Sequence, residues 1–414
     1  MRLKRLKKED KFSDMRLKVC RRGKEENRRQ IKYKVSQNQP KEIKKFKGSQ
    51  NLRMRLLLST LTHTPIEITD IRTDGDGVQV GLRPYEVSLL RLLMLLSNNC
   101  YYEINDTGTK VEYKPGTLMG GRHLVYNCGQ DRAIGYFLEP LLILALYGRN
   151  QLSIDLIGIT NDSRDPSVDT FRSTTIPLLK RFGIPSESLD LKIKSRGVPP
   201  KGGGKVELSI SPIMQNTLKA LTWIDTGLVK SIRGLTFSAR VSAQFEHKIL
   251  QAARGILKPF LQNIPIDTDH KKGLEAGLSP GYGISLVAET TSGCCISADT
   301  TVSYPYSEQD SEEKDLSTAE DAGRKVASDL LHGIEEYGVV DSTHQGLLFL
   351  LCALSAEDVS KVRVGKLSPN GIGALGEIQH FLNVTFAITP DPSTESVLLT
   401  CVGCGQKNLS RKAS

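Results

Sequence analysis

The sequence lacks any apolar stretch long enough to cross a lipid bilayer. Its most apolar run, residues 137–147, falls short of the roughly 20 residues that a spanning helix needs, and it carries Glu139 and Pro140. The first residues also lack the apolar core of a secretory signal peptide. Eight cysteines scattered over 414 residues form no disulfide framework and suit a reducing compartment. We therefore expect a soluble intracellular protein with no membrane partner.

Acidic residues are scarce in the first 47 positions, which hold 19 Lys or Arg and only 6 Asp or Glu, a net charge of +13. The rest of the chain, with 37 basic and 40 acidic residues, has a net charge of −3. The basicity therefore belongs to a tail, residues 1–45, which has few apolar residues and is expected to be disordered. Its clusters at 4–8 and 44–47 suit nuclear import or phosphate contacts. A tail with no dedicated role, or a wrongly assigned start codon, is an equally open alternative.

Beyond residue 52, strand and helix patterns alternate, and paired strands close each unit. This order predicts an α/β or α+β fold of repeated β-α-β-α-β-β units. Strands are expected at 65–71, 111–119, 123–126, 152–159, 189–194, 205–210, 231–241, 284–289, 294–302, 360–364, 385–388 and 397–401. Helices are expected at 85–97, 133–147, 168–182, 243–262 and 372–382, after a capping box of Ser317 and Glu320, and after Asp341.

The segment from Arg196 to Val206 joins two predicted strands and contains three consecutive glycines. Glycines permit positive φ and expose successive N–H groups, so the segment could cradle an anion beside its basic side chains. An equally good interpretation is a hairpin loop whose glycines only satisfy backbone geometry. The candidates for anion or RNA binding are Arg196, Lys201, Gly202, Gly203, Gly204 and Lys205.

This segment resembles the signature of the RNA 3'-terminal phosphate cyclase family: Arg or His, Gly, two free positions, Pro, one free position, three Gly, one free position and an aliphatic residue. Residues 114–121 and 158–171 resemble two further segments of that family, and the resemblance covers roughly residues 48–405. It implies a large domain of three β-α-β-α-β-β repeats at 46–224 and 341–406. A smaller α/β domain would be inserted at 225–340, and residues 407–414 would form a C-terminal tail.

The resemblance also implies a chemistry that this sequence has lost. Cyclases of the family use ATP to adenylate a histidine, pass AMP to an RNA 3'-phosphate and close a cyclic phosphate. The segment that matches the nucleophile's surroundings has Asn370 in its place, and an amide cannot carry the covalent step. The family's opening glycine-rich loop corresponds to residues 47–53, where Gln50 and Arg53 persist but the glycine run and its acidic residue are gone. We expect no catalytic residue and no cofactor, and Arg53 joins the candidates for anion or RNA binding.

Both losses are typical of the family's non-catalytic, cyclase-like branch, whose C-terminus residues 398–405 also resemble. That branch implies a nucleolar factor in the processing of small-subunit (18S) pre-rRNA. Its implied partners are a pre-ribosomal GTPase and proteins of the small-subunit processome, with pre-rRNA as a further candidate.

Other hypotheses stay open at this point. An RNA endonuclease could use Asp162, Asp165 and Asp341 with a metal, or a residual cyclase could use a displaced nucleophile. A scaffold without RNA contact would suit a body of net charge −3. Cys401 and Cys404 form one CxxC without a second pair, so no structural zinc site is predicted.

Overall fold

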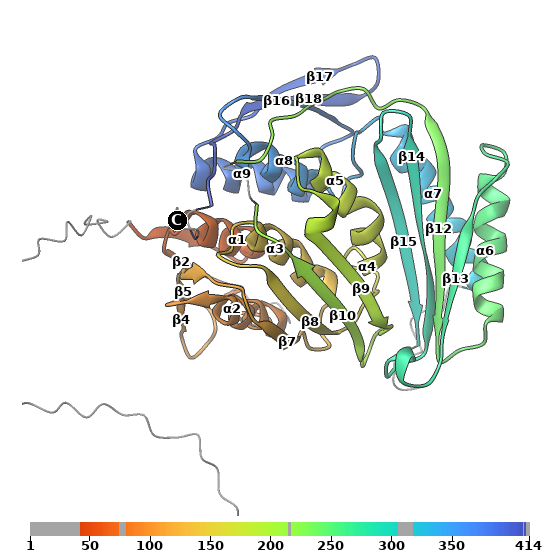
Figure 1. The fold of residues 1–414 in the computed structure, drawn as a ribbon, viewed down its shortest axis with the longest axis horizontal. Helices are drawn as coiled ribbons and strands as arrows, with labels where there is room; N and C mark the ends of the chain where they lie inside the picture. Colours follow the sequence, from red (N-terminus) through yellow and green to blue (C-terminus); the bar gives the residue numbers. More distant parts are fainter. Residues whose placement is uncertain (1–41, 74–79, 214–216, 305–317, 409, 411–414) are drawn as a thin grey trace, which may run out of the picture. The chain divides into compact units, whose positions relative to one another are not determined.

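The computed structural model describes residues 42–73, 80–213, 217–304, 318–408 and 410, which form a mixed α/β fold with four four-stranded sheets (Figure 1). The predicted α/β class is therefore confirmed. The predicted basic tail lies outside the described residues as far as position 41. Among the helices that are described, none combines the length and apolarity needed to cross a membrane.

Three of the sheets share one connectivity. In each, the chain runs through a strand, a helix and a second strand parallel to the first. After another helix it forms an antiparallel pair, and the last strand of that pair takes a central position in the sheet. The first has the order β1-β2-β5-β4: β1 (Lys44–Lys47), α1 (Leu52–Thr62), β2 (Ile66–Thr69), α2 (Pro84–Leu96), β4 (Tyr101–Ile104) and β5 (Val111–Lys114). Beside it, β3 (Ser97–Asn98) pairs with β6 (Thr117–Leu118).

The second and third sheets follow the same plan. The second has the order β7-β8-β10-β9: β7 (His123–Asn127), α3 (Ile134–Leu146), β8 (Leu152–Gly158), α4 (Val168–Thr170), α5 (Ile176–Arg181), β9 (Leu189–Ser195) and β10 (Gly204–Ile210). The third has the order β11-β16-β18-β17: β11 (Thr222–Trp223), α8 (Gln345–Leu354), β16 (Val359–Val364), α9 (Pro369–Leu382), β17 (Ala387–Asp391) and β18 (Ser396–Val402).

The fourth sheet lies between β11 and α8 in the sequence and has the order β13-β12-β14-β15. It consists of β12 (Val229–Ala239), β13 (Ile266–Lys271), β14 (Gly281–Thr290) and β15 (Cys295–Ser303), with α6 (Gln244–Leu257) and α7 (Ala319–Glu335). Both helices are amphipathic, and their apolar sides pack on one face of the sheet (Figure 1). This sheet and its helices therefore have a hydrophobic core of their own.

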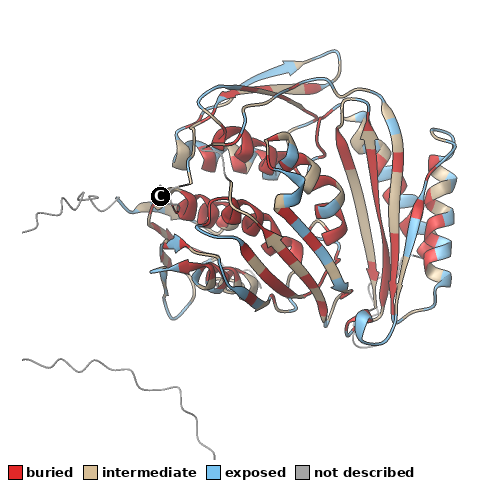
Figure 2. Ribbon diagram, viewed as in Figure 1, coloured by how far each residue is buried: buried red, intermediate tan, exposed pale blue. Residues whose placement is uncertain are grey.

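The larger core is built around helices that are buried on every side. All residues of α3 and α8 are buried, as the red ribbons of Figure 2 show. A helix that is apolar around its whole circumference needs partners on all its faces. The core that α3 and α8 share with α1, α2 and the three similar sheets provides those partners.

The structure corrects two expectations at helix and strand ends. Residues 44–47, expected as a basic cluster of the tail, form β1, because Phe46 pairs opposite Ile68 and stacks on Phe381 with ring centroids 5.4 Å apart. The N-cap of α7 is Thr318, whose hydroxyl accepts a hydrogen bond from the backbone N–H of Asp321 (3.1 Å). The predicted capping box of Ser317 and Glu320 was therefore wrong by one position.

Candidate functional site

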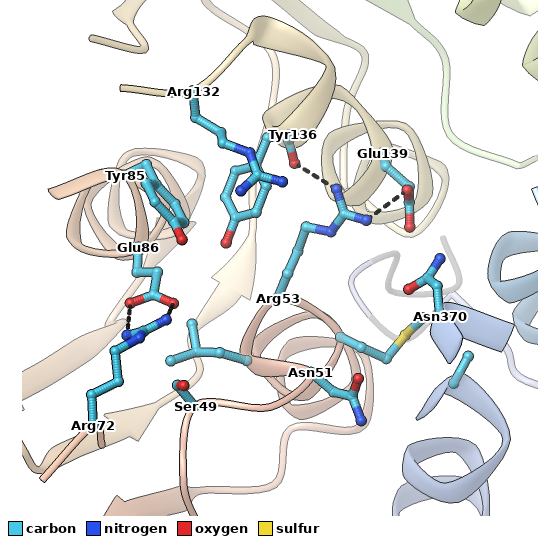
Figure 3. Close-up of a pocket in the computed structure, with 13 residues that line it drawn as sticks. Ser49, Asn51, Arg53, Arg72, Tyr85, Glu86, Arg132, Tyr136, Glu139 and Asn370 are labelled. Atoms are coloured by element: carbon cyan, nitrogen blue, oxygen red, sulfur yellow. Dashed lines mark hydrogen bonds and ion pairs between the residues drawn. The ribbon is translucent and has the colours of Figure 1, made fainter. Parts of the chain in front are cut away.

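A cavity of about 270 Å³ lies where α1, α2, α3 and α9 approach one another (Figure 3). The chain turns from β1 into α1 through Gly48 and Asn51, both with positive φ, and this turn forms one wall. Buried Arg55 of α1 donates from Nε to Glu377 of α9 (2.8 Å). This ion pair fixes the two helices against each other and so positions the cavity between them. Its lining residues are Ser49, Asn51, Leu52, Arg53, Met54, Arg72, Tyr85, Glu86, Arg132, Tyr136, Glu139, Asn370 and Ala374.

Two sequence-predicted residues meet in this cavity although 317 positions separate them. Arg53, in the first turn of α1, reaches Glu139 of α3 with its Nη2 (2.9 Å) and lies 5.1 Å from the centre of the Tyr136 ring. Asn370 is the second residue of α9, after the N-cap Ser368, whose hydroxyl accepts from the N–H of Gly371 (3.1 Å). The segments predicted to have lost the cyclase loop and the nucleophile therefore line one pocket.

Each arginine of the cavity has its own carboxylate. Arg72 forms two hydrogen bonds with Glu86 (2.8 and 2.7 Å), and these raise the pKa of Arg72 (Figure 3). Arg132 forms two with Asp165 (2.6 and 2.9 Å), which raise the pKa of Arg132 although burial opposes its charge. Because these charges are balanced, the cavity offers guanidinium edges, tyrosine hydroxyls and amides for hydrogen bonding rather than a strong positive field.

Sequence reasoning missed Arg72, Arg132 and Glu139. A signal existed for Glu139, because a carboxylate in the middle of an apolar helix requires a buried partner. Nothing local in the sequence pairs Arg132 with a residue 33 positions away.

The signature segment contributes none of the described lining residues of this cavity. Arg196 is only 1% exposed and donates to Asp269 Oδ2 (2.9 Å), to Asn161 Oδ1 (3.2 Å) and to both oxygens of Asp169. These carboxylates raise the pKa of Arg196 against the effect of burial, and Arg196 in turn lowers the pKa of Asp169. The guanidinium of Arg196 is thus engaged inside the fold, and its candidacy for anion or RNA binding stays a prediction.

At the three glycines of the signature, the backbone lies so close to neighbouring atoms that a side chain would not fit. Gly202 donates to the carbonyl of Val198 (3.0 Å) and accepts from the N–H of Leu278 (2.9 Å). A Cβ on Gly203 would lie 2.6 Å from Leu278 Cγ, and one on Gly204 would lie 2.6 Å from the nitrogen of Gly197. The structure thus favours the hairpin-loop interpretation over an anion cradle.

The two lysines of the segment are also placed. Lys201 is exposed, and its backbone N–H donates to Ser279 Oγ (3.0 Å). Lys205 forms an ion pair with Asp155 on the neighbouring strand (2.8 Å). Together these contacts make residues 196–206 a joint that fastens the second sheet to the loop between β13 and β14.

The carboxylates of the endonuclease hypothesis are engaged within the fold. Asp162 accepts from the N–H of Asp165, which is itself bound by Arg132. Asp341 accepts from Ser297 Oγ and His344 Nδ1, both at 2.7 Å. Asp165 and Asp341 line a second cavity of about 320 Å³, but Asp162 does not. Across the ranges that the structure describes, no three His, Cys, Asp or Glu side chains gather in a way that could hold a metal ion.

Comparison with known proteins gives a consistent result. The profile of the family "RNA 3'-terminal phosphate cyclase" matches residues 44–388. A probable RNA 3'-terminal phosphate cyclase-like protein of Arabidopsis thaliana is 58% identical over 90% of this chain and 99% of its own length. The human RNA 3'-terminal phosphate cyclase-like protein is 45% identical over 88% of this chain and 97% of its own. The rRNA processing protein RCL1 of Saccharomyces cerevisiae is 32% identical over 89% and 97%.

Proposed function

The chain belongs to the RNA 3'-terminal phosphate cyclase family, in its cyclase-like branch, and from that premise we propose that it is a non-catalytic factor in the processing of small-subunit (18S) pre-rRNA. Relatives in two yeasts, 38% and 32% identical to this chain, are named as rRNA processing proteins. We assign that role to this chain, without the cyclase reaction.

The observation that carries the proposal is that Asn370 and the segment with Ser49, Asn51 and Arg53 line one cavity. Each segment departs from the family pattern independently, and their convergence supports the view that both belonged to one ancestral site. A cyclase nucleophile must accept AMP on an imidazole nitrogen, whereas the amide nitrogen of Asn370 is not nucleophilic. No histidine, cysteine or lysine is among the described residues that line the cavity. The pocket therefore suits binding better than covalent chemistry.

We further propose that this cavity, rather than the signature loop, contacts RNA. Among the sequence candidates, Arg53 lines this cavity, where Arg132 and the rings of Tyr85 and Tyr136 accompany it. Guanidinium groups and aromatic faces are the groups that proteins use to bind single-stranded RNA. The internal pairing of Arg196 supports a structural role for the signature loop.

The cellular setting and the domain plan are part of the same proposal. We propose a nucleolar location and partners in the pre-ribosome that include a GTPase and processome proteins. The shared connectivity of three sheets supports a large domain of three repeats, and the separate core between Ile232 and Leu330 supports an inserted domain near residues 225–340.

The loss of catalysis is tested with the full chain and radiolabelled ATP. We expect no acid-labile adenylate and no cyclisation of an oligonucleotide that ends in a 3'-phosphate. An active cyclase of the same family, assayed in parallel, is the control for both steps. An adenylate formed by this chain would overturn the non-catalytic part of the proposal.

The processing role is tested by depleting the protein from its own cells and measuring pre-rRNA on northern blots. We expect uncut small-subunit precursors to accumulate and mature 18S rRNA to fall relative to large-subunit rRNA. Re-expression of the wild-type chain should restore processing. An unchanged ratio of the two mature rRNAs on depletion would refute the role.

A further inference from the structure

The loop between β13 and β14, residues 272–279, is held rigidly although it lies at the surface. Its backbone accepts a hydrogen bond from the N–H of Arg196 at Glu275 (2.8 Å) and from Arg240 Nε at Gly277 (2.7 Å). At its far end, the N–H of Leu278 donates to Gly202 (2.9 Å). The joint described above and Arg240 thus fix this loop at three points.

Two leucines project from this fixed loop into solvent. Leu274 is 97% exposed and Leu278 is 57% exposed. The loop lies at one end of the fourth sheet and is partly pale blue in Figure 2. Single apolar side chains on a surface need no explanation, but two on one anchored loop form a preformed contact. Because the backbone of this loop is already ordered, the loop loses little conformational entropy when a partner covers the leucines.

Two exposed cations belong to this loop or contact its backbone. Lys272 and Arg240 are both exposed, and no carboxylate in the described part of the chain lies within 4 Å of either cation. Neighbouring Lys271, in contrast, is paired with Asp269 (3.4 Å) and Glu275 (3.0 Å). The loop therefore presents apolar groups beside two uncompensated cations.

We propose that residues 272–279 and Arg240 form a docking surface for a segment of a partner protein that carries carboxylates next to apolar side chains. The carboxylates pair with Lys272 and Arg240, and the apolar side chains cover Leu274 and Leu278. An RNA strand would engage the cations but would leave the leucines uncovered, because leucine offers bases no stacking face. The complementarity in charge and in apolar surface favours a protein segment. This surface is separate from the cavity with Asn370 and does not depend on its role.

The proposal is tested by selecting from a phage-displayed library of random 12-residue peptides on the immobilised full chain. We expect enrichment of peptides that place Asp or Glu beside Leu, Phe or Trp. A synthetic peptide of the enriched sequence is then titrated by fluorescence anisotropy against the wild-type chain, Leu274→Ser and Lys272→Glu. Each substitution should weaken binding about tenfold, since burial of a leucine and a direct charge contact each contribute on that scale.

The matched control is Leu228→Ser. Leu228 is 79% exposed and precedes β12, whereas Arg240 follows it, so the two lie about 40 Å apart along the strand. The control should bind the peptide as the wild type does. The proposal fails if no acidic and apolar peptide is enriched, or if Leu274→Ser binds it as tightly as the wild type. It also fails if Leu274→Ser weakens binding to a single-stranded 30-nucleotide RNA or to vesicles containing phosphatidylserine instead.

Discussion

Replacement of Arg196 by methionine tests the joint most directly. The substitution keeps the length of the side chain but removes the charge that compensates Asp169 and Asp269. Asp169 is only 6% exposed, so water cannot take over the role of the guanidinium. The variant therefore leaves a buried carboxylate without its partner.

The expected loss of stability follows from the burial of the ion pair between Arg196 and Asp169. Removal of one partner from a buried ion pair costs about 3–5 kcal/mol. A folded body of roughly 370 residues has an unfolding entropy of about 0.8 kcal/mol/K, so the expected fall in Tm is about 4–6 °C.

Differential scanning calorimetry of the full chain measures this change. Arg324→Met is the matched control, since Arg324 forms an exposed pair with Asp321 and its loss should shift Tm by no more than about 1 °C. The double variant Arg196→Met with Asp169→Asn should recover part of the loss, because no buried charge is left unpaired. A single variant as stable as the wild type, or a double variant that simply adds two losses, would refute the reasoning.

Three further predictions follow from the same structure. Burial lowers the pKa of His344, but the carboxylate of Asp341 raises it more, so the pKa in the folded protein lies above the ordinary 6.5. The ion pair therefore stabilises the fold fully below pH 6.5, and this stabilisation is lost as the pH rises through the folded-state pKa. The difference in Tm between wild type and His344→Gln should therefore shrink between pH 6 and pH 9, and a constant difference would contradict the pairing. Thr318→Ala should cost about 1 kcal/mol in urea unfolding by removing the N-cap of α7, whereas an unchanged midpoint would count against that cap. Asn370→His should not regain adenylate formation, because residues 47–53 lack the glycine run, and a labelled adduct would show that the imidazole alone suffices.

The sequence predicted best where one local pattern sufficed. The helix expected at 133–147 is α3, and the strands expected at 152–159 and 205–210 are β8 and β10, because dense apolar runs and alternation survive in any context. α1 was not predicted: it is buried on nearly all sides, so it lacks a polar face, and its N-cap Asn51 forms no side-chain cap. β1 was not predicted as a strand, because three of its four residues are lysines and only Phe46 packs into the fold.

The candidate site was predictable only in part, because its contacts join residues that are far apart in the sequence. Arg53 and Asn370 came from the family resemblance, which assigns positions without any knowledge of contacts. The pairing of Arg72 with Glu86, and of Arg132 with Asp165, is a property of folded geometry that no local pattern encodes. Arg196 is a further case: a basic residue beside glycines suggests a phosphate site, and no local pattern announces its ion pairs with Asp169 and Asp269.

The joint also determines the order in which contacts form during translation. As the chain leaves the ribosome, Arg196 meets Asp169, 27 positions earlier, but Asp269 emerges 73 positions later. Leu221 waits still longer, because its partner Ser360 lies 139 positions further on. Until Asp269 emerges, the guanidinium of Arg196 has one of its two carboxylate partners, and until Ser360 emerges the N–H of Leu221 lacks its partner. The nascent chain therefore completes these long-range contacts only after residue 360 has emerged.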